Sequence, residues 1–186
     1  MKTHEPTPLL IFPCNGNGLE ALDCLGEGWY CMGFVDDTAA KQASGAYGYR
    51  VMPRAALADL ADARVLAVPG GPTSYHSRRK VIEALQVPHE RFARVIHPTA
   101  RVSSLAILGQ NVLIMAGVVV TSNVVIGSHV CVLPNTVVHH DAVIGDWSLV
   151  GSNVTVSGGV AIGQNCYIGC GSSIKHGIRI GCLGAQ

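Results

Sequence analysis

The sequence predicts two structural units in one chain: an α/β unit over residues 1–95 and an all-β, left-handed parallel β-helix over residues 96–186. Three observations lead to this division. In the second half, aliphatic residues recur at every sixth position and glycines at every eighteenth. Charged residues fall mainly in the first half, because residues 96–186 contain only five: Arg101, Asp141, Asp146, Lys175 and Arg179.

The six-residue period runs through the second half without a gap. Steps of six from Val102 reach Val, Ile or Leu at fourteen positions, the last of which is Ile180. This period fits neither an α-helix nor a long strand, which alternates by two. It fits short strands joined by tight turns, three to a coil, with coils stacked about 4.8 Å apart. The hexapeptide-repeat β-helix has this signature.

The eighteen-residue period marks one complete coil. We expect its glycines to form one corner of the prism, at a turn with positive φ. Because the coils carry few charges, their flat outer faces are expected to be buried between copies of the chain, which predicts a homotrimer. A monomer with exposed apolar faces is the alternative. The repeating glycines are Gly109, Gly127, Gly145, Gly163 and Gly181.

The first half alternates between predicted strands and helices. Apolar runs predict strands over residues 9–12, 32–35 and 65–68, and helices are expected over residues 19–25 and 77–85. Strands that end in glycine-rich loops and alternate with helices predict a parallel sheet. Its ligand crevice should lie at the carboxyl ends of the strands. We therefore expect a Rossmann-like βαβ unit.

Three loops of this unit are candidates for binding a nucleotide. The first contains Gly16-x-Gly18-x-x-Ala21, a degenerate dinucleotide-type turn. An acidic pair follows the second strand, where such a group often meets a ribose or base. With about three strands the unit is too short for a dinucleotide fold, which favours a nucleotide-linked substrate over NAD(P). The alternative is that the glycines only form tight turns. The predicted substrate-binding residues are Asn15, Gly16, Asn17, Gly18, Asp36, Asp37, Gly70 and Gly71.

Composition excludes several classes of function. Thirteen basic and twelve acidic residues leave a net charge of +1, so the chain lacks the basic field that nucleic-acid binding requires. No uncharged apolar stretch of about 18 residues could span a bilayer, and residues 1–10 have no apolar core of a signal peptide. Seven cysteines without a Cys-x-x-Cys pair indicate reduced thiols. We expect a cytoplasmic protein with no nucleic-acid or membrane partner.

The chain resembles the nucleotide-sugar acetyltransferases of the PglD/NeuD type over essentially its whole length. The resemblance rests on the small βαβ unit, the segment His97-Pro98-Thr99-Ala100, the uninterrupted hexapeptide repeats and VHHDAVIG at residues 138–145. Members of this family N-acetylate amino sugars or O-acetylate sialic acid. The resemblance therefore implies acetyl-CoA as co-substrate and a nucleotide sugar as acceptor.

The resemblance also assigns residues. In the family, a histidine followed by an acidic residue carries catalysis, and here the matching residues are His140 and Asp141. Leu149 stands where a second family histidine is often found, and Pro13 stands where the glycine loop usually begins with Gly. The sequence also ends before the family's final coil, so the adenine end of CoA is expected to be held differently unless the chain is truncated.

The residue types fit acetyl transfer to an amine. A neutral histidine is the natural general base near pH 7, and a neighbouring carboxylate can orient it. One coil after His140 comes Gly158, where a backbone N–H could stabilise the oxyanion, as a glycine at this offset does in the family. Together with Gly159 it leaves room for the thioester. Lys175 and Arg179 are expected near the CoA phosphates, although they could equally be ordinary solvated charges.

The other histidines and cysteines have simpler interpretations. We expect His139 to be only a neighbour of the base, His129 and His176 to lie on outward faces, and Cys166 to fill the core. Three histidines could in principle hold a metal ion, as in γ-class carbonic anhydrases. The acid and amide groups that activate water in such a site are not evident, so no metal is expected.

The sequence pattern and the family resemblance together imply a homotrimeric acetyl-CoA-dependent N-acetyltransferase for bacterial surface glycan biosynthesis. Its acceptor would be the amino group of a nucleotide-linked sugar such as a 4-amino-4,6-dideoxyhexose. The amine would reach His140 at a junction between subunits and attack the thioester directly. Two alternatives stay open: a sialic acid O-acetyltransferase, and a non-catalytic scaffold trimer that binds sugar nucleotides.

Overall fold

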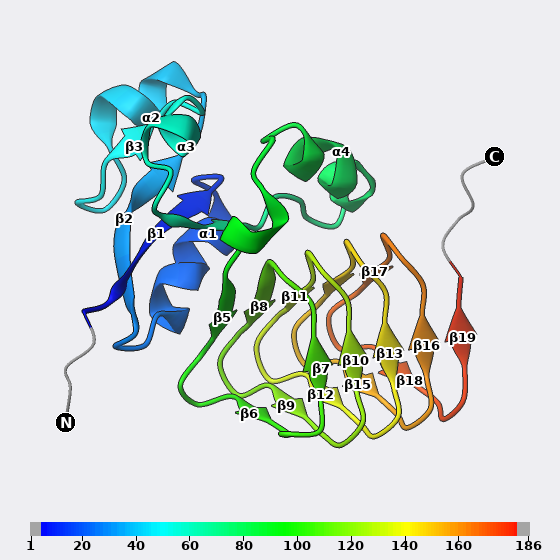
Figure 1. The fold of residues 1–186 in the computed structure, drawn as a ribbon. Helices are drawn as coiled ribbons and strands as arrows, with labels where there is room; N and C mark the ends of the chain where they lie inside the picture. Colours follow the sequence, from blue (N-terminus) through cyan, green and yellow to red (C-terminus); the bar gives the residue numbers. More distant parts are fainter. Residues whose placement is uncertain (1–4, 182–186) are drawn as a thin grey trace.

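The computed structural model describes residues 5–181. Its second half consists of short strands in three parallel five-stranded sheets, an arrangement that fits a left-handed parallel β-helix (Figure 1). The first sheet contains β5 (Arg94–Ile96), β8 (Val112–Ile114), β11 (Cys131–Val132), β14 (Leu149–Val150) and β17 (Tyr167–Ile168). The second contains β6 (Arg101–Val102), β9 (Val119–Val120), β12 (Val137–Val138), β15 (Thr155–Val156) and β18 (Ser173–Ile174). The third contains β7 (Ile107–Leu108), β10 (Val125–Ile126), β13 (Val143–Ile144), β16 (Ala161–Ile162) and β19 (Arg179–Ile180).

The predicted coil length is confirmed by the strand register. Val125 pairs with Val143, and Val137 pairs with Thr155, so each strand lies beside the strand eighteen residues further along the chain. Every sixth residue from Ile114 to Ile174 is buried inside the prism. Cys166 is buried in the same cluster, as predicted. Burying these ladders of aliphatic side chains is the main source of stability for the coils.

The glycine ladder was predicted to have positive φ, and this prediction is wrong. None of Gly109, Gly127 and Gly145 is among the positive-φ glycines. A Cβ atom at Gly145 would lie 2.6 Å from the carbonyl carbon of Gly163, so the ladder is glycine because backbones of successive coils approach closely there. Positive φ recurs at a different place, once per turn, where Asn and Gly predominate because they tolerate it best. These residues are Asn111, Gly117, Asn123, His129, Asn135, Asp141, Trp147, Asn153, Gly159, Asn165, Gly171 and Gly177.

The first half contains a four-stranded parallel sheet with the order β3-β2-β1-β4. The three predicted strands are confirmed as β1 (Thr7–Phe12), β2 (Trp29–Val35) and β4 (Arg64–Ala67), whereas β3 (Val51–Met52) was not predicted. The helix predicted over residues 19–25 begins earlier, at Gly16. The helical segments are α1 (Gly16–Glu20), η1 (Ala21–Cys24), α2 (Ala39–Ser44), α3 (Ala56–Asp59), η2 (Tyr75–Ser77), α4 (Arg78–Glu83) and η3 (His89–Arg91). The Rossmann-like assignment of this unit stays a prediction.

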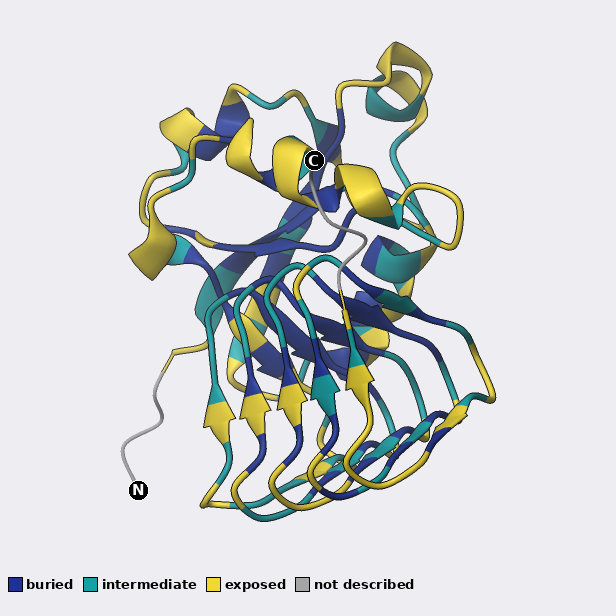
Figure 2. Cartoon of the chain, turned by 90° about the vertical axis from the view of Figure 1, so that its right-hand side faces the viewer, coloured by how far each residue is buried: buried dark blue, intermediate teal, exposed yellow. Residues whose placement is uncertain are grey.

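The two halves share a hydrophobic cluster. Leu9 and Ile11 of β1 are buried together with Leu113, Cys131 and Leu149 of the first β-helix sheet. The N-terminal unit therefore covers that sheet, while the third sheet presents exposed strands to solvent (Figure 2). The boundary at residues 95 and 96 stays a prediction, since β5 spans it and pairs with β8.

A buried arginine fastens the junction. Arg78 is 1% exposed and donates hydrogen bonds to the carbonyl oxygens of Pro69, His129 and Trp147. It thereby joins the loop after β4 to two successive coils. Breaking any of these hydrogen bonds would leave a buried donor unpaired, which costs free energy, so the loop is held in a fixed position against the β-helix.

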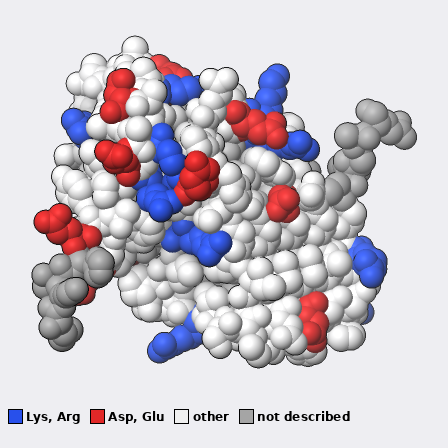
Figure 3. Space-filling model, in the orientation of Figure 1, with Lys and Arg blue, Asp and Glu red and all other residues white. Residues whose placement is uncertain are grey.

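The surface reflects the uneven composition. Charged side chains gather over the N-terminal unit, and the visible face of the coils carries few (Figure 3). None of the described helices is long and apolar enough to cross a membrane. The six cysteines within residues 5–181 form no disulfide with one another, and five of them are buried.

Candidate active site

His140 and Asp141 lie in the turn between β12 and β13. Asp141 has a φ of 61°, a left-handed conformation that aspartate tolerates better than most residues. The His140 Nδ1 and Asp141 Oδ2 atoms are 2.7 Å apart. A carboxylate can only accept a hydrogen bond, so Nδ1 carries the proton. The neutral imidazole then presents its unprotonated Nε2 to solvent, which is the form that a general base requires.

Asp141 is itself held by the preceding coil. The Asn123 side-chain amide, one coil earlier, donates to Asp141 Oδ1 at 3.1 Å. The hydrogen bond from His140, supported by that from Asn123, lowers the pKa of Asp141 below its usual range. The aspartate therefore stays ionised and keeps the imidazole in one tautomer. Asn123 was not predicted as a site residue, although its eighteen-residue spacing from Asp141 could have revealed it.

Gly158 lies directly beneath the His140 ring. A Cβ atom at Gly158 would be 2.8 Å from both Cε1 and Nε2 of His140, so the imidazole occupies the space that a side chain would need. The Gly159 N–H donates to the His140 carbonyl oxygen at 3.0 Å and is not available to a ligand. The Gly158 N–H makes no hydrogen bond within residues 5–181. The structure thus places the His140 ring over a buried glycine whose N–H has no hydrogen-bond partner among these residues.

A second histidine, His176, lies at the same corner, two coils after His140. His176 is exposed, as predicted, and its Cε1 atom would lie 3.5 Å from a Cβ atom at Gly159. Lys175 and Arg179 are exposed in the same final coil. Neither cation has an ion pair with the described carboxylates, so both are free to meet an anionic ligand.

The His140 corner borders the second and third sheets of the β-helix, which are the two that the N-terminal unit leaves uncovered. Aliphatic side chains on the outer face of the third sheet are exposed: Ile107 by 65%, Val125 by 36% and Val143 by 41%. A stripe of this kind is typical of a surface that contacts another protein. The corner therefore lies between two faces that are open to a neighbour.

The predicted nucleotide-binding loops meet at the carboxyl ends of β1, β2 and β4. Asn15 caps α1 by accepting the Gly18 N–H at 2.9 Å. Asn17 donates to the Gly70 carbonyl oxygen at 3.1 Å and so ties two loops together. A Cβ atom at Gly18 would lie 2.2 Å from the Pro13 carbonyl oxygen, which requires glycine there. Gly16 and Gly71, by contrast, have open space where a side chain would stand.

The acidic pair has two different environments. Asp36 is 7% exposed and pairs with Lys41 at 2.7 Å. Burial raises its pKa, but hydrogen bonds from Lys41 and Thr38 outweigh this and hold it below the usual range. Asp37 is half-exposed and pairs with Arg54 at 3.0 Å. The Asp36 carboxylate therefore stabilises the loop, whereas the half-exposed Asp37 carboxylate is accessible to a ligand.

A crevice of about 390 Å³ opens among Phe12, Asp36, Asp37, Thr38 and Arg54. The Arg54 guanidinium lies over the Phe12 ring at 5.9 Å, and its Nε is buried without a hydrogen-bond partner. The exposed part of this guanidinium, beside an aromatic ring, suits an anionic or planar ligand. Sequence reasoning missed Arg54, because it belongs to no recognisable motif.

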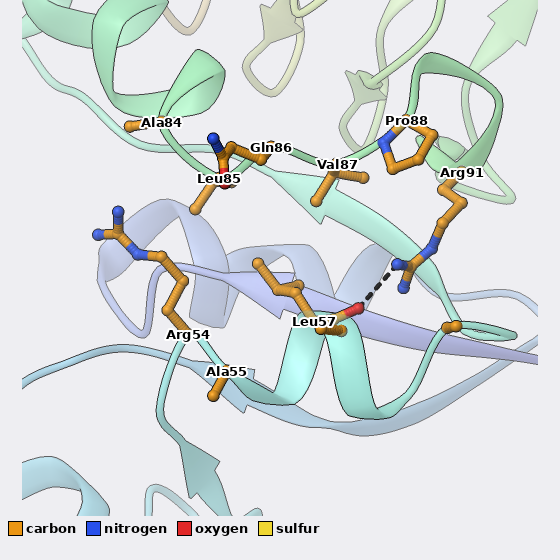
Figure 4. Close-up of a pocket in the computed structure, with 11 residues that line it drawn as sticks. Arg54, Ala55, Leu57, Ala84, Leu85, Gln86, Val87, Pro88 and Arg91 are labelled. Atoms are coloured by element: carbon orange, nitrogen blue, oxygen red, sulfur yellow. Dashed lines mark hydrogen bonds between the residues drawn. The ribbon is translucent and has the colours of Figure 1, made fainter.

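A second hollow, of about 500 Å³, lies between α3 and the end of α4 (Figure 4). Its walls are largely Ala, Leu, Val and Pro side chains. Arg91 lines one end and donates to the carbonyl oxygens of Leu57, Leu60 and Ala63, so its donors serve the fold. None of the predicted site residues lines this hollow. We assign it no role in the site.

His129 was predicted on an outward face, and this prediction is wrong. The side chain is 6% exposed and stacks on Trp147 at 3.8 Å between ring centroids. Its Nδ1 lies 3.1 Å from the Asn111 side-chain amide, which also bonds the Ala67 backbone. Burial lowers the pKa of His129 to about 4. It is a neutral structural residue at the junction of the two halves. Within residues 5–181, no group of three or more His, Cys, Asp or Glu residues is placed to hold a metal ion.

Comparisons with known proteins agree with this architecture. Residues 105–139 and 123–158 match the bacterial transferase hexapeptide family of six-repeat units. The matched segments span the coils from β7 to β15. The sequence has no significant match among curated proteins.

Three solved structures are similar over nearly the whole chain. One is a histidine-to-asparagine variant of perosamine N-acetyltransferase from Caulobacter crescentus in complex with CoA and GDP-perosamine. It has a TM-score of 0.79 and 24% identity, covering 96% of this chain and 84% of that one. The acetyltransferase domain of PglB from Neisseria gonorrhoeae FA1090 has a TM-score of 0.69 and 22% identity, covering 96% and 98%. WeeI from Acinetobacter baumannii AYE has a TM-score of 0.71 and 20% identity, covering 95% and 89%. The resemblance expected from the sequence is confirmed at the level of the fold.

Proposed function

We propose that this protein transfers an acetyl group from acetyl-CoA to the amino group of a nucleotide-linked amino sugar. One observation carries the proposal: the Nε2 of His140, freed by the Nδ1–Asp141 bond, lies over the bare backbone of Gly158. Two of the structurally similar proteins are described as acetyltransferases, and one of them is in complex with CoA and a nucleotide sugar. Acetyl-CoA and a nucleotide-linked amino sugar are accordingly the substrates proposed here.

The geometry supports direct transfer without a covalent enzyme intermediate. The sugar amine attacks the thioester carbonyl while His140 Nε2 removes its proton, and Asp141 stabilises the resulting imidazolium. The Gly158 N–H can donate to the oxyanion that forms, an interaction worth roughly 3–4 kcal/mol in comparable sites. Collapse of the intermediate then expels the CoA thiolate. Lys175 and Arg179 would attract the CoA phosphates from the last described coil.

The nucleotide would be bound in the crevice at the carboxyl ends of the strands. Arg54 can stack on a base or pair with a phosphate, and Asp37 can accept hydrogen bonds from a base or ribose. The glycines at positions 16, 18, 70 and 71 allow the ligand to approach the backbone closely. Asp36 acts indirectly, by fixing the loop through Lys41 and Thr38.

A homotrimer would complete the site. The N-terminal unit covers the one sheet that does not border the His140 corner, so the crevice and the base of a single chain lie on different sides of the prism. Packing the exposed aliphatic face of the third sheet against a neighbour buries apolar area. It would also bring the neighbour's crevice toward His140.

The activity is tested by thiol release from acetyl-CoA in the presence of candidate sugars. A nucleotide-linked 4-amino sugar should give release, and the matched 4-hydroxy sugar should not. His140→Ala should abolish release with the amino sugar, while His139→Ala should retain most of it. Release with free sialic acid instead would assign O-acetylation. Absence of release with every acceptor, combined with tight nucleotide-sugar binding, would favour a scaffold.

The shared site is tested by mixing inactive variants. Arg54→Glu disables the proposed crevice, and His140→Ala disables the base. Random co-assembly at equal amounts should restore about a quarter of the wild-type rate, because each site takes its two parts from different subunits. A mixture that is no more active than its components would place both parts in one chain. Light scattering should give about three times 19.5 kDa.

A further inference from the structure

The His140 corner contains a second imidazole that the proposed mechanism does not use. One column of turn residues runs along this corner at eighteen-residue intervals: Ser122, His140, Gly158 and His176. Stacked coils are about 4.8 Å apart, so His140 lies in the turn one coil before Gly158 and His176 in the turn one coil after it. The two side chains therefore flank the same glycine pair.

Both rings lean toward that pair. The His140 ring lies 2.8 Å from a Cβ atom built on Gly158, and His176 Cε1 lies 3.5 Å and Nε2 3.9 Å from one built on Gly159. Consecutive Cα atoms are only about 3.8 Å apart, so the rings reach over neighbouring points of one turn. The two imidazole rings therefore lie over one turn, with His140 covering Gly158 and His176 beside Gly159.

His176 has no structural task that explains this position. Its side chain is exposed and makes no hydrogen bond within residues 5–181. His140, by contrast, is fixed through Nδ1 by Asp141. A thioester that approaches Nε2 of His140 at this turn would therefore have the His176 ring beside it as a second imidazole.

Resting on the proposed function, we propose that His176 is the catalytic acid that protonates the departing thiolate of CoA. The amine nitrogen forms a bond to the acetyl carbon and gives its proton to His140 Nε2. When the tetrahedral intermediate collapses, the carbon–sulfur bond breaks and its electron pair goes to sulfur. Protonated His176 then gives a proton to that sulfur, which leaves as the thiol. Exchange of one proton with solvent at each histidine restores the enzyme, so the reaction balances.

This role predicts a dependence on the leaving group. An alkyl thiolate is basic, since the comparable cysteine thiol titrates near pH 8.5, so its departure benefits from an acid. A selenolate is far less basic and leaves without one. Acetyl-selenocoenzyme A differs from acetyl-CoA only in the atom that leaves, so the enzyme should bind both donors alike. A variant that lacks the acid should therefore be slow with acetyl-CoA and not with the selenoester.

The experiment measures kcat with both donors for wild type, His176→Ala, His176→Gln and the control His139→Ala. His176→Ala and His176→Gln should lower kcat with acetyl-CoA by about 10²-fold, yet lower it by less than about threefold with the selenoester. An equal loss with both donors, or no loss with either, would overturn the inference.

The His140→Ala variant makes failure of the two proposals distinguishable. It should lose activity with both donors, because removal of the amine proton does not depend on the leaving group. If wild type transfers acetyl from neither donor, the proposed function is wrong and the role of His176 is wrong with it. If His140→Ala behaves as expected and the His176 variants show no donor dependence, only the role of His176 is refuted.

Discussion

Gly158→Ala should inactivate the enzyme without unfolding it. Gly158 is not among the positive-φ glycines, so its backbone can accept an alanine without strain. The three atoms nearest to the new methyl group all belong to the His140 ring: Cε1 and Nε2 at 2.8 Å and Cδ2 at 3.3 Å. The substitution therefore acts first on the proposed base.

The magnitude follows from that distance. Non-bonded carbon atoms rest about 3.5–4.0 Å apart, so the imidazole must move by roughly 0.7 Å or more. It cannot do so freely, because Nδ1 is held to Asp141 at 2.7 Å. A misplacement of about 1 Å in a reacting group can cost on the order of 10²-fold in rate. We expect kcat to fall by about this factor while the Gly158 N–H remains in place.

Steady-state kinetics, thermal unfolding and light scattering together test this prediction. Gly28→Ala is the matched control, since a Cβ atom there meets nothing within 4 Å. The double variant His140→Ala/Gly158→Ala should be no slower than His140→Ala, because no ring is left to displace. A Gly158→Ala enzyme with wild-type kcat, or a double variant in which the two losses add, would refute the placement of His140 over Gly158.

Three further predictions follow from other contacts. Gly145→Ala should lower the free energy of unfolding by roughly 1–3 kcal/mol in a denaturant titration, because its Cβ atom would lie 2.6 Å from the next coil. His129 is neutral in the folded protein at pH values where the unfolded chain protonates it. The free energy of unfolding should therefore fall by up to about 3 kcal/mol as the pH drops from 6.5 to about 4. In His129→Phe this dependence of the free energy of unfolding on pH should be weaker. Asparagine also tolerates a φ of 61°, so Asp141→Asn should leave the melting temperature unchanged. It removes the negative charge that orients and stabilises the imidazole, so kcat should fall by an amount between those for His139→Ala and His140→Ala.

The architecture of the coils was predictable because it is repetitive. Each hexad has to bury one aliphatic side chain, and fourteen repetitions make the period visible in a single sequence. The reason for the glycine ladder was not predictable in the same way. Periodicity locates a required glycine, but it does not say whether φ or the approach of a neighbouring backbone requires it.

The N-terminal unit was predicted less completely. Buried strands such as β1 and β4 are apolar runs and stand out in the sequence, whereas β3 has only two residues and pairs with β2 alone. His129 was misplaced because its position in the repeat is shared by exposed turn residues. It is buried only because Trp147 and Phe92 pack on it, and Phe92 comes from a segment before the repeats. Such contacts between distant segments leave no local signal.

The proposed site residues share a position that the fold leaves free. Hexapeptide coils constrain the inward residues and the positive-φ residue of each turn, whereas the residue before it lies at the corner and is not part of the aliphatic core. In the column that contains His140, the side chains at this position differ from coil to coil. Ser122 carries a hydroxyl, His140 and His176 carry imidazoles, and Gly158 has no side chain. The side chain at this corner position can therefore differ from coil to coil while the aliphatic core stays the same. This separation is why Gly158→Ala and His140→Ala should act on rate, whereas Gly145→Ala should act on stability.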